Sequence, residues 1–350
     1  MNAAVETPPA TTSRAVRLPS GNTFQVDVGE TVLAAAMRQN IGLPYGCRNG
    51  ACGSCKGTIV SGEVDYGAYQ ARTLTDAEKA QGKALFCCAK PKTDLVLDVR
   101  EISAGDIQVR TLPCRVEKID KLAHDVVALK LRLPANERLQ FRAGQYIDIL
   151  LKDGKRRSFS MANAPHADEF IELHIRAVPG GTFSQHVMHE MKERAILRFE
   201  GPLGSFCLNE DSDKPIIFMA GGTGFAPIKA IIEHALHAHI DRQMVLYWGA
   251  RSLRDLYLPD LPAKWQREYS HLTFIPVLSD PLPEDHWQGR TGLVHQAILD
   301  DFSDMAGYEV YACGAPIMIE VGQRAFAARG LPPEAFFADS FTYAAAPAGV

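Results

Sequence analysis

The sequence predicts a multidomain protein that joins an α+β domain, a small antiparallel β-barrel and a doubly wound α/β domain with a parallel sheet. Three observations lead to this class. An N-terminal segment surrounds a loop rich in cysteine and glycine, the middle segment consists mainly of short strands, and the C-terminal segment alternates strands with helices. A chain of 350 residues can bury two or three cores, and we place the domains at 14–104, 110–210 and 213–341.

The α+β domain has clear local signals. Thr31 is a suitable N-cap for an alanine-rich helix, and Thr75 and Glu78 have the spacing of a capping box. In chain order we expect a β-hairpin, a helix, a strand with its turn, a short helix and a closing strand over residues 14–28, 31–40, 57–67, 75–82 and 94–102.

The other two domains show a different order of strands and helices from the first. Short strands separated by turn residues indicate the barrel, and one helix is expected among them at 182–191. The expected strands are 114–122, 126–134, 143–151, 156–163 and 170–178. The doubly wound pattern of strands and helices occupies 215–220, 226–240, 244–250, 271–279, 293–302, 309–314 and 316–330, with a closing strand after 336.

Composition excludes several classes of protein. With 46% hydrophobic and 22% charged residues and a net charge of −4, the chain has no clustered basic stripe for nucleic acid and no apolar run as long as a membrane span. The start of the chain lacks the features of a secretory signal and resembles a short disordered tail. Eight cysteines do not form a disulfide scaffold at this length, so we expect a reduced, cytoplasmic protein, and a monomer.

The cysteine loop, GCRNGACGSCKG over residues 46–57, is the strongest chemical signal. Cys47, Cys52 and Cys55 have C-x4-C-x2-C spacing, which is typical of plant-type iron–sulfur loops rather than of structural zinc knuckles. A fourth ligand is available from Cys87 or Cys88 in ALFCCAKP. The alternatives are a structural zinc site or thiols without a ligand.

Two segments of the barrel suit a phosphate group. Arg157 lies in RRSFS, and a guanidinium can make two parallel bonds to a pyrophosphate. In GGTFS, a helix starts near Gly181, Thr182 and Ser184, where free N–H groups attract anions. The alternative for Arg157 is an exposed arginine on a strand.

The doubly wound domain offers a second phosphate loop. Gly221, Gly222 and Gly224 lie between a strand and a helix in AGGTGFAP and permit close approach of a pyrophosphate. The companion segment YACGAPIM ends another strand at Cys313. Because parallel sheets bind ligands at the carboxyl ends of their strands, we expect the two loops to form one site.

These motifs resemble two known families. The C-x4-C-x2-C loop followed by C-x-A-x-P resembles the plant-type ferredoxins, which implies a β-grasp fold and a 2Fe–2S cluster. In that pattern the fourth ligand is Cys87, and Cys88 is a packing residue, so the implied metal ligands are Cys47, Cys52, Cys55 and Cys87.

The R-x-F-S, GGTGFAP and CGAPIM segments resemble the ferredoxin–NADP reductase superfamily, which implies FAD in the barrel and NADH or NADPH on the parallel sheet. The resemblance implies that Ser160 and Cys313 flank the site of hydride transfer. It also implies cofactor contacts from Arg157, Ser158, Phe159, Ser160, His174, Ile175, Gly181, Thr182, Ser184, Gly221, Gly222, Thr223, Gly224, Pro227, Cys313, Gly314 and Pro316.

The fusion of both families is similar to reductase components of oxygenases and to the reductase that serves CDP-6-deoxyhexulose-3-dehydrase. It implies electron transfer from NAD(P)H through FAD to the cluster and then to a partner oxygenase or dehydrase. We favour NADH, because Asp255 follows Arg251 and Arg254 and would repel a 2′-phosphate. The alternatives are a free flavin reductase with an auxiliary cluster and a non-catalytic redox sensor. Phe341 is a candidate for covering the flavin, although nine residues follow it.

Overall fold

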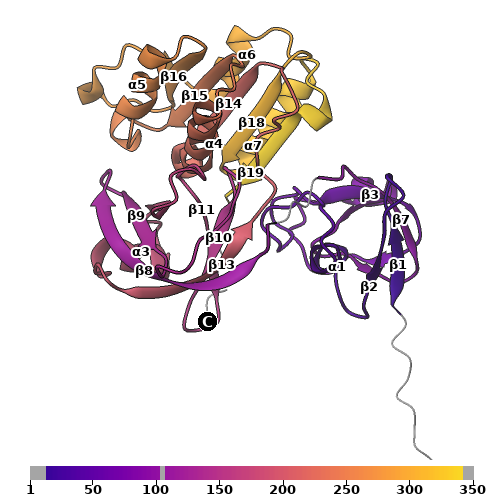
Figure 1. Cartoon of the computed structure of the whole chain (residues 1–350). Helices are drawn as coiled ribbons and strands as arrows, with labels where there is room; N and C mark the ends of the chain where they lie inside the picture. The colour runs from indigo at the N-terminus through magenta and orange to yellow at the C-terminus, as the bar shows by residue number, and fades with distance from the viewer. Residues whose placement is uncertain (1–12, 103–106, 342–350) are drawn as a thin grey trace, which may run out of the picture. The chain divides into compact units, whose positions relative to one another are not determined.

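The computed structural model describes residues 13–102 and 107–341, and the chain divides into two compact units, residues 1–106 and 107–350 (Figure 1). The expected disordered tail, residues 103–106 and the nine residues after Phe341 lie outside the described ranges. Within those ranges, no helix combines the length and apolarity needed to cross a membrane.

The first unit contains a mixed sheet of five strands in the order β2-β1-β7-β3-β5, in which only β1 and β7 pair in parallel. Helix α1 packs its buried residues into the core of this sheet, as expected of a β-grasp domain. The elements are β1 (Arg14–Arg17), β2 (Thr23–Val26), α1 (Val32–Arg38), β3 (Lys56–Ser61), β4 (Val64–Asp65), α2 (Asp76–Ala80), β5 (Lys83–Leu85), β6 (Lys90–Pro91) and β7 (Leu95–Asp98).

The predicted helix caps of this unit are confirmed. The Thr31 side chain accepts from the N–H of Ala34 at 3.2 Å, and Thr75 and Glu78 form a complete capping box. These bonds satisfy N–H groups that the first turn of a helix leaves without a partner. The starts of both helices therefore follow from local sequence.

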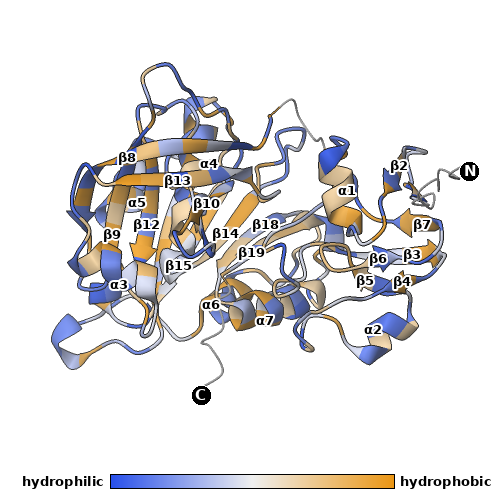
Figure 2. Ribbon diagram, turned by 90° about the horizontal axis from the view of Figure 1, so that it is seen from below, coloured by the Kyte–Doolittle hydropathy of each residue, from blue (hydrophilic) through white to orange (hydrophobic). Residues whose placement is uncertain are grey.

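The second unit begins with an antiparallel sheet in the order β11-β10-β13-β8-β9-β12, which a bridge between Met161 and Leu173 closes into the expected barrel. Figure 2 shows hydrophobic and hydrophilic residues alternating along β12, one face of which joins the barrel core. The elements are β8 (Arg110–Lys121), β9 (Val126–Arg132), β10 (Tyr146–Leu150), β11 (Arg156–Ser160), β12 (Ile171–Arg176), α3 (Thr182–His189) and β13 (Ile196–Leu203). Strand β13 was not among the expected ranges.

The rest of this unit is the expected parallel sheet, in the order β17-β16-β15-β14-β18-β19. Helices α4 and α5 cover one face and α6 and α7 the other. The elements are β14 (Ile216–Gly221), η1 (Gly222–Gly224), α4 (Phe225–His237), β15 (Met244–Ala250), η2 (Leu253–Asp255), α5 (Asp260–Glu268), β16 (Leu272–Leu278), η3 (Pro283–Asp285), β17 (Arg290–Thr291), α6 (Val294–Asp301), β18 (Glu309–Gly314), α7 (Pro316–Ala327), η4 (Pro333–Ala335) and β19 (Phe336–Ser340).

A buried ion pair anchors the segment that enters the parallel sheet. Arg242 Nη2 lies 2.7 Å from Glu309 Oε2, and both side chains are only 5% exposed. The same guanidinium donates to the carbonyls of Lys214 and Asn209. Burial acts to raise the pKa of Glu309, but the bonds from Arg242 and Asn209 outweigh it and lower that pKa.

We expect Arg242→Met to destabilise this domain by about 3–5 kcal/mol, because it leaves the Glu309 carboxylate buried without its cation. Urea unfolding followed by tryptophan fluorescence measures this effect, since all three tryptophans, Trp248, Trp265 and Trp287, lie in the domain. The matched control is Lys264→Met, which removes an exposed pair with Glu268 and should cost less than about 0.5 kcal/mol. Equal unfolding midpoints for the two variants would contradict the argument.

Candidate functional site

Of the five cysteine thiols in the first unit, the four predicted iron ligands contact one another in two pairs. Cys47 contacts Cys52, and Cys55 contacts Cys87. Three backbone N–H groups also donate to these sulfurs: Ala51 to Cys47 at 3.3 Å, Cys47 to Cys52 at 3.3 Å and Cys87 to Cys55 at 3.5 Å. Among the described residues, no group of three or more His, Cys, Asp or Glu side chains is arranged to hold a metal ion. Two thiols for each of two irons fit a binuclear cluster, and the N–H groups are the outer bonds that tune it.

The electrostatics of each pair favour one thiolate and one neutral thiol, because the pKa values of Cys52 and Cys55 are raised mainly by their bonds to Cys47 and Cys87. The pKa of Cys47 is lowered mainly because Cys52 donates to it. The pKa of Cys87 is lowered mainly because Cys55 donates to it, with Cys88 adding a second bond. Cys88 lies beside Cys87 with 3.5 Å between the sulfurs and is itself buried. The thiolate is the form that binds iron.

The loop that carries these cysteines is held by its backbone. Gly50 adopts φ +73°, and a Cβ there would lie 2.7 Å from Cβ of Tyr69. The N–H of Gln70 donates to the carbonyl of Gly50 at 3.2 Å, and the Thr73 hydroxyl donates to that of Ala51 at 3.3 Å. The segment around Tyr69 and Thr73 therefore covers the cysteine loop only because residue 50 has no side chain.

In the barrel, the two predicted phosphate segments come together. The rings of Phe159 in β11 and Phe183 in α3 lie 5.6 Å apart. Helix α3 starts at Gly181 without a side-chain cap, so its first N–H groups stay available to an anion. Ser184 turns its hydroxyl back to the carbonyl of Gly181 at 3.1 Å.

The R-x-F-S residues alternate across β11. Ser158 donates to the buried carboxylate of Asp148 at 2.6 Å, and Arg157 donates to the carbonyl of Arg156 at 2.8 Å. Ser160, at the end of the strand, is buried. Arg157 is half-buried, which leaves it placed to bind a phosphate group.

The glycine loop and the CGAP segment meet where β14 and β18 end. A Cβ on Gly224 would lie 2.1 Å from the carbonyl oxygen of Cys313, and one on Gly314 would lie 3.1 Å from Cα of Gly221. The sequence therefore predicted correctly that these two loops lie together. Cys313 is fully buried, and burial, with the Asp339 charge, raises the pKa of its thiol. Pro316 begins α7, Pro227 is buried in the first turn of α4, and Thr223 lies in η1 of the glycine loop.

His174 and Ile175 point in different directions from β12. Ile175 is buried in the barrel core, whereas the His174 ring contacts Glu172 and Tyr257, which follows η2 in the parallel-sheet part of the unit. The next charged residue, Arg176, lies against the glycine loop, where its Nη1 is 2.7 Å from the position of a Cβ on Gly222. Sequence reasoning missed Arg176 and Tyr257, although an arginine at the end of a mostly buried strand was an available signal.

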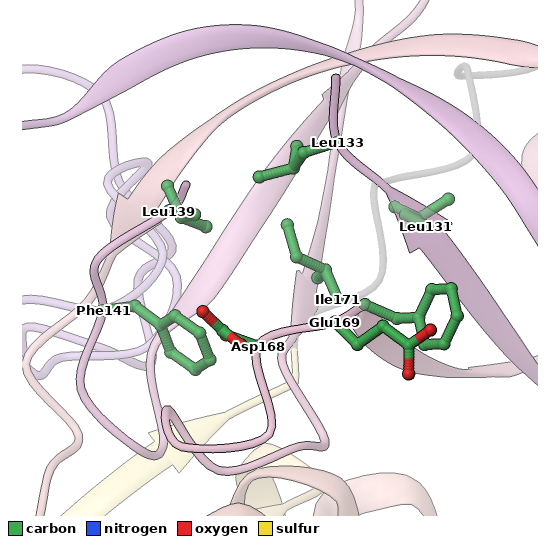
Figure 3. Close-up of a pocket in the computed structure, with 8 residues that line it drawn as sticks. Leu131, Leu133, Leu139, Phe141, Asp168, Glu169 and Ile171 are labelled. Carbon is green, nitrogen blue, oxygen red and sulfur yellow. The ribbon is translucent and has the colours of Figure 1, made fainter. Parts of the chain in front are cut away.

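A small pocket lies elsewhere in the barrel (Figure 3). Leu131, Leu139 and Phe141 form its apolar side, and the carboxylates of Asp168 and Glu169 lie at its edge. None of its lining residues belongs to the predicted site. An acidic edge also makes it a poor receptor for phosphate.

Comparison with protein families assigns each sheet separately. Residues 16–92 match the 2Fe-2S iron-sulfur cluster binding domain, 113–207 the oxidoreductase FAD-binding domain and 218–324 the oxidoreductase NAD-binding domain. The class is thus settled: the chain is an NAD(P)H-dependent iron–sulfur flavoprotein oxidoreductase, with FAD and a 2Fe–2S cluster as its cofactors.

Relatives match almost the whole chain. It is 42% identical over 324 residues to the CDP-6-deoxy-L-threo-D-glycero-4-hexulose-3-dehydrase reductase of Yersinia pestis, covering 92% of this chain and 96% of that one. It is 36% identical over 321 residues to reductase component 2 of terephthalate 1,2-dioxygenase from Comamonas, covering 91% and 94%. The crystal structure of the Amycolatopsis cytochrome P450 reductase GcoB superposes with a TM-score of 0.76 at 34% identity, over 94% and 99% of the chains. The chain belongs to the ferredoxin reductase family with an N-terminal 2Fe–2S domain.

The pairing of thiols leads us to expect that Cys87→Ser loses the cluster and that its neighbour Cys88→Ser keeps it. Cys87 contacts Cys55 directly, whereas Cys88 contacts Cys87. Visible absorption and the EPR spectrum of the reduced protein measure the cluster in each variant. Normal spectra for Cys87→Ser together with a lost cluster in Cys88→Ser would sink the assignment.

Proposed function

We propose that this chain is the electron-supplying reductase of a partner oxygenase or deoxysugar dehydrase. The observation that carries the proposal is the continuous match of all three domains to reductases of both kinds. When bound, FAD accepts a hydride from NAD(P)H and releases electrons singly, and the 2Fe–2S cluster carries one electron at a time. The partner then takes these electrons from the chain.

The residues of each domain would bind one cofactor or substrate. Cys47, Cys52, Cys55 and Cys87 hold the iron, and the paired contacts of their thiols support that assignment. The domain limits we infer, 14–104, 110–210 and 213–341, are supported by family matches that fall inside or close to them.

In the barrel, Arg157 and the N–H groups at the uncapped start of α3 would bind the flavin pyrophosphate, and Ser160 and Phe159 would contact the flavin ring system. The contact between Phe159 and Phe183 supports a single flavin site made from β11 and α3.

In the nucleotide-binding domain, the loop from Gly221 to Gly224 would bind the pyrophosphate of NAD(P)H, and Cys313 would contact the nicotinamide. Burial raises the pKa of the Cys313 thiol and keeps it neutral. Cys313 therefore adds no charge to this site. The contact between Gly224 and the carbonyl of Cys313 supports this arrangement, since it brings the two loops into one site.

We also propose that the protein is a cytoplasmic monomer. The free cysteines of the described residues support a reducing compartment, because the cluster needs thiols rather than disulfides.

We expect Cys55→Ser to abolish reduction of cytochrome c while NADH-dependent reduction of ferricyanide continues. Cytochrome c takes single electrons from the cluster, whereas ferricyanide accepts directly from the flavin. Steady-state assays with both acceptors on the FAD-loaded variant measure this split. A free flavin reductase would keep both activities, and loss of both with FAD still bound would show that the order of transfer is wrong.

We expect NADH to be the better substrate, with a kcat/KM at least tenfold above that for NADPH. The carboxylate of Asp255 accepts from the N–H and hydroxyl of Ser252 at 3.0 and 2.9 Å, which holds it just beyond the end of β15. Arg251 is 82% exposed and already faces Asp280 at 3.5 Å. Both carboxylates disfavour a 2′-phosphate.

Steady-state kinetics with each nucleotide tests this preference, and Asp280→Asn is the informative variant. Freeing Arg251 should raise kcat/KM for NADPH and leave that for NADH within twofold. An NADPH value tenfold above that for NADH in the parent protein would overturn the preference and identify Arg251 or Arg254 as the phosphate ligand.

A further inference from the structure

A buried polar network crosses from the barrel to the nucleotide-binding domain. The His174 side chain in β12 is fully buried, with Nε2 2.9 Å from Glu172 Oε1 and Nδ1 3.0 Å from the hydroxyl of Tyr257. Tyr257 follows η2 in the nucleotide-binding domain and is also buried. The network therefore joins two domains at one strand of the barrel.

The protons of this network have one consistent arrangement. Burial acts to raise the pKa of Glu172, but the bond from His174 and the charges of Lys229 and Lys130 lower it to about 2. Burial lowers the pKa of His174, so the ring is neutral. Because the carboxylate can only accept, Nε2 of His174 carries the proton, and Nδ1 accepts from Tyr257. Every group is satisfied.

Lys229 makes a second link from the same carboxylate. It lies in the second turn of α4, is only 7% exposed, and is 3.6 Å from Glu172 Oε1. Its ammonium also donates to the carbonyl of Ala162 in the barrel at 2.9 Å and to Glu233 at 3.0 Å. Helix α4 begins directly after the glycine loop, so this link fixes the helix that carries the loop.

From Tyr257 the contacts continue to the glycine loop itself. Its ring packs edge-on against Trp248 at 5.0 Å, and Trp248 stacks on Phe225 at 3.9 Å. The indole Nε1 of Trp248 donates to the carbonyl of Gly222 at 3.0 Å. Both routes from Glu172 thus end at the loop that would bind the nucleotide.

We propose that Glu172, His174, Tyr257 and Lys229 are positioning residues that set the glycine loop against the flavin-binding barrel and thereby set the rate of hydride transfer. This inference rests on the proposed function. None of the four touches the reacting atoms in this role; they act through Trp248, Phe225 and the loop. Hydride transfer is sensitive to such placement, because a shift of about 1 Å can cost about a hundredfold in rate.

The test compares two single-atom changes in the nucleotide-binding domain. Tyr257→Phe removes only the hydroxyl that reaches His174 and keeps the ring contact with Trp248. The matched control is Tyr247→Phe, which removes a bond from another buried tyrosine ring to the partly exposed Asp301 on the other face of the same sheet. Anaerobic stopped-flow mixing of each FAD-loaded full-length protein with saturating NADH gives the rate of flavin reduction.

We expect Tyr257→Phe to reduce flavin about tenfold more slowly at saturating nucleotide, with its FAD content unchanged, and Tyr247→Phe to stay within twofold of the parent. Because the hydroxyl is buried and bonded to His174, the loss should appear in the saturating rate more than in KM. A Tyr257→Phe rate within twofold of the parent, or a loss no larger than that of Tyr247→Phe, overturns the proposal.

Hydrogen exchange provides a readout that does not depend on activity. The amides of Thr223, Gly224 and Phe225 should exchange faster in Tyr257→Phe than in the parent and should be unchanged in Tyr247→Phe. Equal protection of this loop in all three proteins overturns the proposal. A parent protein that neither NADH nor NADPH reduces would instead refute the proposed function, and the exchange measurement would still decide the positioning role.

Discussion

The nucleotide-binding domain depends on one close approach of two backbones, where β14 and β18 end side by side. A Cβ on Gly224 would lie 2.1 Å from the carbonyl oxygen of Cys313, far inside any tolerable contact. Because both strands are parallel and neighbours in the sheet, their carboxyl ends open on the same edge. The missing side chain lets α4 start there, which in turn brings its N–H groups and Cys313 to one place.

The ferredoxin unit also depends on a close approach that only a glycine permits, although its site binds iron rather than a nucleotide. Gly50 leaves room for Tyr69 and the segment that follows it, and backbone N–H groups rather than side chains reach the sulfurs of the cysteine loop. In both units the backbone forms much of the site, and side chains supply only a few specific groups. This is why glycine spacing in the sequence was so informative about function.

The parts of the fold that the sequence predicted are those with local causes. Thr31, Thr75 and Glu78 cap helices through bonds that span three residues. The glycine loops were predicted from the spacing of their glycines in the sequence. Strand β13 was missed because it contains Gly201 and Pro202, which weaken a strand pattern, and its pairing with β8 and β10 supplies what the local sequence lacks. Helix α5 has no side-chain cap and contains Pro262, so no local signal marks its start.

The contact of His174 with Tyr257 shows the limit of sequence reasoning most clearly, since the two residues are 83 positions apart. The strand pattern predicts that His174 faces away from the barrel core, on the side opposite Leu173 and Ile175, but not which domain covers it. Apolar packing alone could also hold two domains together, because the hydrophobic effect has no direction. Hydrogen bonds are directional. A buried network of them holds its side chains in a single arrangement only when each polar group has a partner. A reaction whose rate depends on the angle and distance between two bound rings gains from that directional contact, so burying Glu172 and Lys229 here has a functional reason that stability alone would not give.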